Sequence, residues 1–377
     1  MGETAMPLQK NAGAVRRFSR LMKFAGWLQN IPNRITPPPF RLMQIGSAFW
    51  QSRVLYVAAR FDIATVLGDE RLTADEIAAH VSADPDATYR LLRMLATLGV
   101  FEEVSPRVFS NNGLSAYLRE DHPKSVRAMI LMHNSEEMSR PWYEQLEKGV
   151  QSGDVPFQLA HGQELFDYMD SHPEFDRLFS RAMDSVEALT GDSFALDFDW
   201  GRFERVIDVG GSKGSKSLAI LKRHPHLKAL VVDRAQVVRE AEQHWTGREA
   251  PALLARLSFQ AGDLFESVPT ATSARDIYLL SAVLHGFDDD SCVKALRNIA
   301  GACAGTGARI ALMEMVLPES RPDLASASLD MQLFMGTRGR GRTLDEWLRL
   351  FDRSGLVLEE QVGLQSFAKI LVLQSRL

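Results

Sequence analysis

The sequence predicts an α/β protein in which a mostly helical region precedes a largely parallel β-sheet, and three observations support this prediction. From residue 205 onward, apolar runs of strand length alternate with amphipathic helical stretches, a pattern typical of a parallel sheet covered by helices on both faces. Before residue 195 the apolar residues follow helical spacing instead. The length of 377 residues suits about two domains.

The predicted sheet is built from five apolar runs. In chain order they read RVIDVG, ALVVD, LSFQAGD, DIYLLSAVLH and RIALMEMVLP, and helical patterns such as SLAILKRHP separate them. The C-terminal stretch LVLEEQVGLQSFAKILVLQSRL reads as two more strands joined by a turn around Gly363–Ser366. Because a terminal hairpin cannot continue a parallel winding, one edge strand is expected to run antiparallel. Such a sheet binds its ligand at the carboxyl ends of its strands.

Composition shifts along the chain predict four segments. A basic amphipathic arm with a Pro-rich linker occupies residues 1–40, and a winged-helix-like domain follows over residues 41–120. Residues 121–195 form a helical connector rich in Met, Phe, Trp and Tyr, which either line a pocket for a flat ligand or pack as core. The sheet domain spans residues 196–377.

The second segment carries the pattern of a winged helix. Thr73 and Glu76 have the spacing of a capping box, and Asp84 can cap the next helix. The stretch Val100–Phe109 alternates and turns as a wing does. Such modules often bind DNA, but residues 50–120 contain seven arginines and no lysine against ten acidic residues, the wrong sign for phosphate contacts. We therefore expect an interaction or dimerisation module.

The arm has a basic face and an apolar face at helical spacing. Its four positive charges are Arg16, Arg17, Arg20 and Lys23. Packing on the body or on a second subunit is the favoured interpretation, and contact with an anionic membrane surface is the alternative. The long apolar pattern FRLMQIGSAFWQSRVLYVAA that follows would be a large exposed patch in a monomer, which favours an interface.

Bulk composition excludes several classes. The net charge of −5 provides no field for nucleic acid, and no apolar run has the roughly 20 residues of a membrane span. Two cysteines indicate a reducing cytoplasm rather than a disulfide framework. No His, Cys or carboxylate cluster has the spacing of metal ligands, so no metal is expected.

Three features at successive strand ends indicate an adenosine-containing cofactor. Gly210 and Gly211 end the first strand with a turn that lets a ligand approach the backbone. Asp233 ends the second strand, where a carboxylate can accept both hydroxyls of a ribose, and Asp263 follows the third, where it can take an amine. An acidic residue at one strand end is weak evidence, whereas three features in order are stronger.

With its motifs DVGGSKG, LHGFDDD and GRGRT, the chain resembles the S-adenosylmethionine-dependent O-methyltransferases of the plant caffeate and bacterial small-molecule type, from about residue 42 to the end. The resemblance implies a Rossmann-like seven-stranded methyltransferase sheet with an antiparallel terminal strand. It also implies S-adenosyl-L-methionine as the cofactor, a small aromatic acceptor and a homodimer formed through the N-terminal domain.

The resemblance also implies the cofactor-binding residues. By position, the methionine part of the cofactor would lie near Asp208, Gly210, Gly211, Ser212 and Gly214. The ribose would lie at Asp233, and the adenine at Asp263, Leu264 and Phe265. The strand before the catalytic residue would add Ser281. The family usually has DVGGGTG, so Ser212 replaces a glycine, and we expect it to be tolerated if its backbone angles are ordinary. Lys213 either pairs with the cofactor's carboxylate or points to solvent.

Catalytic residues are implied in the same way. His285 lies where the family's LHDWxDE motif has its general base, and Glu314 matches a carboxylate that orients it. The second orienting carboxylate of the family's GGxERT motif is here Gly341. The implied reaction is methyl transfer to a hydroxyl, more specifically a phenolic one. Methylation of nitrogen or carbon, or a family member that keeps the cofactor site without methylating, remain alternatives.

The acceptor pocket is implied less directly. Aligned positions suggest Phe179 and Met183 as a clamp on an aromatic acceptor, with His133 or Asn134 opposite the catalytic histidine. Phe166 belongs either to the wall of this pocket or to the core.

Overall fold

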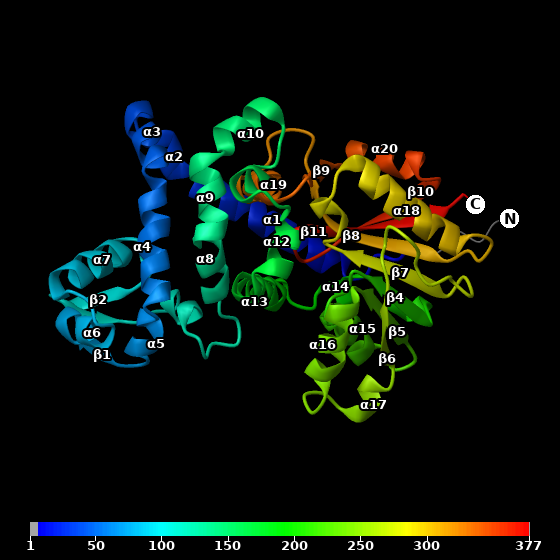
Figure 1. The fold of residues 1–377 in the computed structure, drawn as a ribbon, viewed down its shortest axis with the longest axis horizontal. Coiled ribbons are helices and arrows are strands. Elements are labelled where there is room, and N and C mark those ends of the chain that lie inside the picture. The colour runs from blue at the N-terminus through cyan, green and yellow to red at the C-terminus, as the bar shows by residue number, and fades with distance from the viewer. Residues whose placement is uncertain (1–6, 377) are drawn as a thin grey trace. The chain divides into compact units, whose positions relative to one another are not determined.

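Residues 7–376, which the computed structural model describes, fold into two units (Figure 1). The described residues up to Gly26 join those from Asp192 onward in one, which we call the sheet unit. Trp27–Gly191 form the other, which we call the helical unit. The division of the chain into four segments stays a prediction.

The sheet unit is built on a mixed sheet with the strand order β10-β11-β8-β7-β4-β5-β6 and a short β9 paired to β8. Its strands are β4 (Arg205–Val209), β5 (Lys228–Asp233), β6 (Leu257–Ala261), β7 (Asp276–Ser281), β8 (Arg309–Leu317), β9 (Arg342–Thr343), β10 (Leu356–Gly363) and β11 (Ala368–Ser375). Strands β4 to β8 pair in parallel. The five predicted runs are therefore confirmed as parallel strands, and the α/β fold class with them.

The C-terminal hairpin is also confirmed, with one difference. Strand β11 pairs antiparallel with both β8 and β10. The antiparallel strand thus lies one position inside the edge, and β10 forms the edge itself. The second strand of the hairpin, rather than the first, continues the sheet, and β10 follows the helix α20 (Leu344–Arg353) in the chain.

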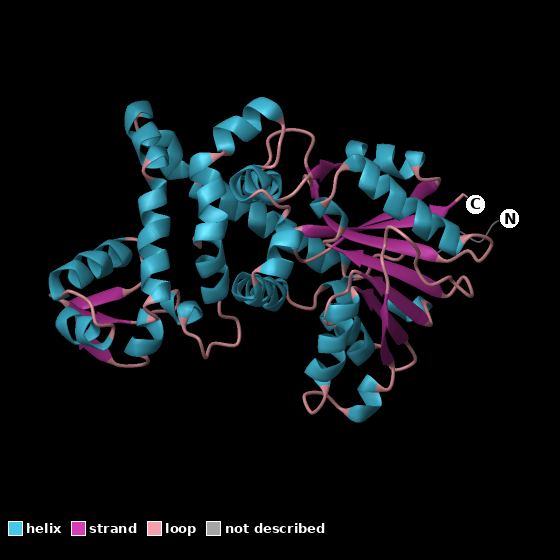
Figure 2. Ribbon diagram, viewed as in Figure 1, coloured by secondary structure: helices cyan, strands magenta, loops and turns pink. Residues whose placement is uncertain are grey.

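Helices lie on both sides of the sheet (Figure 2), and an apolar core lies on each of its faces. Along β4, Ile207 and Val209 enter one core and Val206 the other, as the alternation of side chains in a strand requires. The first core also contains residues of α18 (Asp289–Cys303) and α20. The second takes residues of α14 (Phe194–Asp197) and α15 (Ser215–Arg223). Further helices of this unit are α16 (Ala235–Trp245), α17 (Pro251–Leu254) and α19 (Leu324–Gly336).

The helical unit contains a small three-stranded sheet in the order β1-β3-β2. Its elements are α2 (Ile31–Ile35), α3 (Pro38–Gly46), α4 (Ala48–Arg60), α5 (Ile63–Leu67), β1 (Arg71–Thr73), α6 (Ala74–His80), α7 (Pro85–Thr97), β2 (Glu102–Ser105), β3 (Val108–Ser110), α8 (Arg127–His133), α9 (Glu136–Glu144), α10 (Leu146–Ser152), α11 (Pro156–His161), α12 (Leu165–Ser171) and α13 (Pro173–Thr190). The antiparallel pair β2–β3 is the predicted wing, and the capping box at Thr73 is present.

The N-terminal arm packs on the sheet unit at its start. The backbone N–H groups of Leu8 and Gln9 donate to the carboxylate of Glu360 at 2.8 and 3.1 Å, and Lys10 pairs with Asp199 at 3.3 Å. Helix α1 (Ala12–Gln29) follows. Packing on the body is therefore observed for this part of the arm, and contact with a membrane surface stays a prediction. Over residues 7–376, no helix combines the length and apolarity that crossing a membrane requires.

Candidate active site

The candidate cofactor residues lie together at one edge of the sheet. Strands β7, β4, β5 and β6 are neighbours and run parallel, so their carboxyl ends meet at the same edge. The glycine turn follows β4 and Asp263 follows β6, while Asp233 and Ser281 are the last residues of β5 and β7. Backbone hydrogen bonds join these loops, from Gly210 to Val232 at 2.8 Å and from Gly262 to Asp233 at 3.0 Å. This edge is where open α/β sheets bind their ligands.

Close packing explains the glycines of this turn. Gly210 has φ +73°, and a Cβ placed on it would lie 2.8 Å from Val283 Cγ2. A Cβ on Gly211 would lie 2.7 Å from Oδ2 of Asp208. That carboxylate is buried and accepts a hydrogen bond from the Ser217 hydroxyl at 2.7 Å. The Asp208 carboxylate therefore packs directly against Gly211 of the turn.

Ser212 is in the left-handed region, with φ +51°. The sequence-based expectation that serine is tolerated here assumed ordinary backbone angles, and the angles are not ordinary. A residue with a Cβ is strained in this region, where glycine is not. The backbone N–H of Ser212 donates to Oδ2 of Asp233 at 2.8 Å, which fixes the turn in this conformation.

We expect the substitution Ser212→Gly to raise the free energy of unfolding by about 0.5–1 kcal/mol, because relief of the left-handed strain outweighs the entropy that glycine adds to the unfolded chain. The measurement is the midpoint of thermal unfolding. Ser212→Val is the matched control and should lower it, since a β-branched side chain adapts poorly to positive φ. A lower midpoint for Ser212→Gly would contradict the strain.

The acidic strand ends hold the loops of this edge in place. Asp233 is half-buried and also accepts a hydrogen bond from the Arg234 N–H at 2.7 Å. The exposed Asp263 accepts one from the Phe265 N–H at 2.8 Å. Trp245, at the end of α16, donates from its indole to the carbonyl oxygen of Lys213 at 2.6 Å and so fastens the turn. Nothing in the sequence pattern indicated this role for Trp245.

His285 lies on the turn after β7 and pairs with Glu314 of β8. Its Nδ1 is 2.7 Å from Oε2 of Glu314, and the Leu284 N–H donates to Oε1 of the same carboxylate at 3.0 Å. The Glu314 side chain is 1% exposed and that of His285 is 26% exposed. Because an ionised carboxylate only accepts, Nδ1 carries a proton and the lone pair of the neutral ring is at Nε2.

Opposing effects set the pKa of His285. Burial disfavours the charged ring, and the guanidinium of Arg342 disfavours it as well. The negative charge of Glu314 and its hydrogen bond outweigh both, so the pKa of His285 is raised above its ordinary value. A neutral imidazole with a raised pKa is a stronger base than a free one.

The turn that carries His285, residues 284–287, is called the histidine turn here. It lies beside two of the loops that carry proposed cofactor residues, the glycine turn and the loop after β6. Val283 lies against Gly210 of the glycine turn. On the other side of His285, the ring of Phe287 meets that of Phe265 edge to face, with centroids 4.9 Å apart. The structure thus brings the proposed base and the proposed cofactor residues to the same edge of the sheet.

The position of the second family carboxylate, Gly341, is crowded by neighbouring side chains. A Cβ on Gly341 would lie 2.8 Å from Leu317 Cδ1 and 3.2 Å from Oδ1 of Asp330. The Gly341 N–H donates to that same oxygen at 2.6 Å. Neighbouring side chains therefore fill the space that a glutamate would need.

The five candidate pocket residues all lie in the helical unit. His133 ends α8, and burial lowers its pKa. The backbone carbonyl oxygen of Asn134 accepts a hydrogen bond from Arg53 at 2.8 Å. The side-chain amide of Asn134 also exchanges hydrogen bonds with the Ser52 hydroxyl, so Asn134 connects the end of α8 to α4. Phe166 and Met183 are exposed, and Phe179 packs against the local core.

Between residues 7 and 376, the structure brings together no group of three or more His, Cys, Asp or Glu side chains that could bind a metal ion. Burial raises the pKa of both Cys292 and Cys303 to about 12, so both stay protonated thiols.

Fold and site together define a class of protein. A turn in which Gly210 and Gly211 leave no space for a side chain follows the first parallel strand, and carboxylates follow at the next two strand ends; this arrangement suits a cofactor with an adenosine. A histidine held by a buried carboxylate beside it suits proton removal. These are the features of an S-adenosylmethionine-dependent methyltransferase.

Comparison with known proteins identifies the family. The profile of the O-methyltransferase domain matches residues 143–357, and that of the O-methyltransferase dimerisation domain matches residues 43–121. The phenazine O-methyltransferase PhzM of Lysobacter antibioticus is 33% identical over 84% of this chain and 91% of its own length. A phenazine-1-carboxylate N-methyltransferase of Pseudomonas aeruginosa is 32% identical over 88% of this chain and 96% of its own.

Solved structures agree with these sequence relatives. The crystal structure of LaPhzM superposes with a TM-score of 0.83 at 30% identity, covering 90% of this chain and 100% of that one. CalO1, a methyltransferase of calicheamicin biosynthesis crystallised with S-adenosylhomocysteine (SAH) bound, gives a TM-score of 0.77 at 28% identity over 89% of this chain and 98% of that one. The chain belongs to the O-methyltransferase family and is an S-adenosylmethionine-dependent methyltransferase.

The dimerisation domain supports the predicted homodimer. Within the helical unit, helices α3 and α4 expose the large apolar side chains of Phe40, Leu42, Met43, Ile45, Phe49 and Trp50, which lie in the apolar stretch predicted to form an interface.

Proposed function

We propose that the protein methylates a hydroxyl of a small aromatic acceptor, phenolic in the simplest case, with His285 as the general base. The observation that carries this proposal is the pair of His285 with the buried Glu314 at the carboxyl edge of the sheet. When bound, S-adenosylmethionine supplies a methyl group on a positively charged sulfur.

The residues of this chain have separate tasks in the proposal. Nε2 of His285 accepts the proton of the acceptor hydroxyl, because the phenol is a poor nucleophile until it loses that proton. Glu314 fixes the tautomer through Nδ1 and stabilises the imidazolium that forms. Asp233 and the glycine turn hold the cofactor, so that the two reactants are brought into line.

The test is formation of S-adenosylhomocysteine with a panel of hydroxyl and amine acceptors. Names of the relatives suggest the panel, which would contain a hydroxyphenazine, 3-amino-4-hydroxybenzoate, phenazine-1-carboxylate and 8-amino-8-demethylriboflavin. We expect turnover with a hydroxyl acceptor that depends on His285. Turnover with the amine acceptors alone would contradict transfer to oxygen.

Methylation of nitrogen is the second candidate. Two relatives are named as N-methyltransferases, and this chain lacks the second orienting carboxylate at Gly341. An acceptor nitrogen with a free lone pair needs less help from a base, so activity on it would survive replacement of His285. Sensitivity to that replacement therefore separates the two candidates.

We also propose that Phe179 and Met183 contact the acceptor, with His133, Asn134 and Phe166 near them, on the strength of the resemblance. Met183 is 37% exposed, so its truncation leaves the core of the helical unit intact. We expect Met183→Ala to raise the KM of the acceptor about tenfold, from the loss of about 1–2 kcal/mol of apolar contact, without changing the thermal midpoint. An unchanged KM would contradict the assignment.

A further inference from the structure

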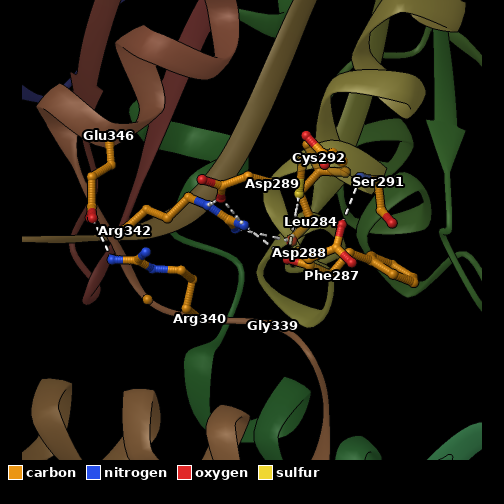
Figure 3. Close-up of polar contacts among 12 residues, drawn as sticks. Leu284, Phe287, Asp288, Asp289, Ser291, Cys292, Gly339, Arg340, Arg342 and Glu346 are labelled. Carbon is orange, nitrogen blue, oxygen red and sulfur yellow. Dashed lines mark hydrogen bonds and ion pairs between the residues drawn. The ribbon is translucent and has the colours of Figure 1, made fainter. Parts of the chain in front are cut away.

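The guanidinium of Arg342 donates hydrogen bonds to the backbone of the histidine turn. Its side chain is 1% exposed. Nη1 donates to the carbonyl oxygen of Leu284 at 3.3 Å and Nη2 to that of Phe287 at 2.8 Å (Figure 3). These carbonyls belong to the residue before His285 and to the second residue after it. One guanidinium thus spans the turn that carries the proposed base.

Leu284, the residue before His285, is held at both of its backbone polar groups. Its N–H donates to Glu314, and its carbonyl oxygen accepts from Arg342. The protonated thiol of Cys292 donates to the same oxygen at 3.2 Å. Strand β9 pairs in parallel with β8, with Arg342 opposite Val316, so Glu314 and Arg342 come from adjacent strands. Together they fix the orientation of the turn.

The contacts around Arg342 suit the planar guanidinium of arginine better than the single ammonium group of lysine. Nε and Nη2 both donate to Oδ1 of Asp289, at 3.0 and 2.8 Å, and the guanidinium lies 5.1 Å from the ring centroid of Trp347. Only the planar fork of arginine makes these contacts and reaches both carbonyls at once. Burying a charge is costly and adds little stability, which favours a functional reason for its presence.

A glycine presses on the turn as well. A Cβ placed on Gly339 would overlap the carbonyl oxygen of His285 and lie 2.7 Å from Cα of Gly286. The two backbones are therefore in direct contact. The segment that leads to Arg342 contacts the histidine turn twice, through Gly339 and through the Arg342 side chain. Figure 3 shows Gly339 and Arg342 on this same segment beside Leu284 and Phe287.

We propose that Arg342 is a positioning residue for His285, which holds the turn so that the imidazole stays on Glu314. It is the arginine of the GRGRT motif, which the chain keeps although it has Gly341 in place of the second orienting carboxylate. The inference rests on the proposed function of His285 as the base.

The charges around the turn determine how the proposal can be tested. Ionisable groups of this region come from four elements, namely Glu314 of β8, Arg342 of β9, Asp288, Asp289 and Cys292 at the start of α18, and Arg338 after α19. Contact with Glu314 raises the pKa of His285, and the charge of Arg342 lowers it. A variant that keeps the charge but loses the fork therefore isolates the positional effect.

That variant is Arg342→Lys, and the readout is the pKa of His285. It would be followed by NMR titration of the full-length protein labelled with ¹³C at histidine Cε1, with His285→Asn to assign the resonance. We expect the pKa of His285 to fall, because the ring leaves Glu314. In the Glu314→Gln background the same substitution should change nothing further. The expected kcat is about tenfold lower, with the KM for S-adenosylmethionine changed less than about twofold.

Arg340→Lys is the matched control. Arg340 lies two residues away and pairs with Glu346 (Figure 3), so its substitution should leave the pKa of His285 unchanged. An unchanged or raised pKa in Arg342→Lys would overturn the proposal. So would an equal fall in the Glu314→Gln background, because Arg342 would then act without Glu314.

A second variant covers the case in which Arg342→Lys does not fold. In Gly339→Ala, the added methyl group displaces the histidine turn without any change of charge. It should lower both the pKa of His285 and kcat, because the ring moves away from Glu314. Values equal to those of the unsubstituted protein would overturn the proposal. The titration needs no acceptor and no turnover. If His285→Asn retained full activity, the proposed base would fail, while the titration would still report whether Arg342 positions the ring.

Discussion

Replacing His285 with asparagine should lower the rate of methyl transfer to a hydroxyl acceptor by about 10²–10⁴-fold, the usual contribution of a general base. Asparagine keeps a polar side chain of similar reach but has no lone pair basic enough to take the proton. The Nε2 lone pair of His285 is left free because Nδ1 faces Glu314 at 2.7 Å. The measurement is the steady-state rate of S-adenosylhomocysteine formation with the best acceptor of the panel.

Binding of the cofactor should survive this substitution. Apart from Ser281, which ends β7, the proposed cofactor residues lie in or just after β4, β5 and β6, whereas His285 follows β7. Calorimetric titration with S-adenosylmethionine should therefore give similar Kd values for the two proteins. A rate that falls less than about threefold while binding is retained would contradict the role of His285.

The second large effect is expected from Glu314→Gln. With the carboxylate gone, the effects that remain on His285 are burial and the charge of Arg342, and both lower the pKa. The base must be neutral to work, so activity rises as pH increases through the pKa of His285. The acid limb of the pH–rate profile should therefore move to lower pH.

The plateau of that profile should also fall, by about tenfold to a hundredfold, because a weaker and less well oriented base accepts the proton more slowly. The measurement is kcat/KM across pH at saturating S-adenosylmethionine. Glu346→Gln, on the partly exposed ion pair with Arg340, is a suitable control, because glutamine can keep the capping box with Thr343, and it should leave the acid limb in place. An acid limb that moves to higher pH in Glu314→Gln would refute the account of this pair.

The sequence was sufficient to predict the elements whose side-chain pattern depends on local geometry. Strand β4 was predictable because Val206 and Ile207 sit on opposite faces of a sheet buried on both sides. The capping box at Thr73 was predictable because its hydrogen bonds join residues three apart. His285 and Glu314 were found through the resemblance, and their contact across two strands could not be derived from spacing.

Other features depend on how distant segments close on each other. The φ of Ser212 is set by its hydrogen bond to Asp233, which no local pattern reports. The Arg-Thr pair in GRGRT is visible in the sequence, but its spacing does not show which distant residues it contacts. Arg342 becomes significant once β9 pairs with β8 and brings it to the turn after β7. The place of β11 inside β10 likewise follows from pairing rather than from composition.

The central claim is transfer of the methyl group to oxygen with His285 taking the proton, and one measurement tests it most directly. The protein and its His285→Asn variant would each react once with ¹³C-methyl S-adenosylmethionine and 3-amino-4-hydroxybenzoate, which offers a hydroxyl and an amine on the same ring, or with the best acceptor of the panel. NMR of the product then locates the label. The account predicts a methoxy carbon from the unsubstituted protein and almost none from the variant. An N-methyl carbon, or equal labelling by both proteins, would contradict it.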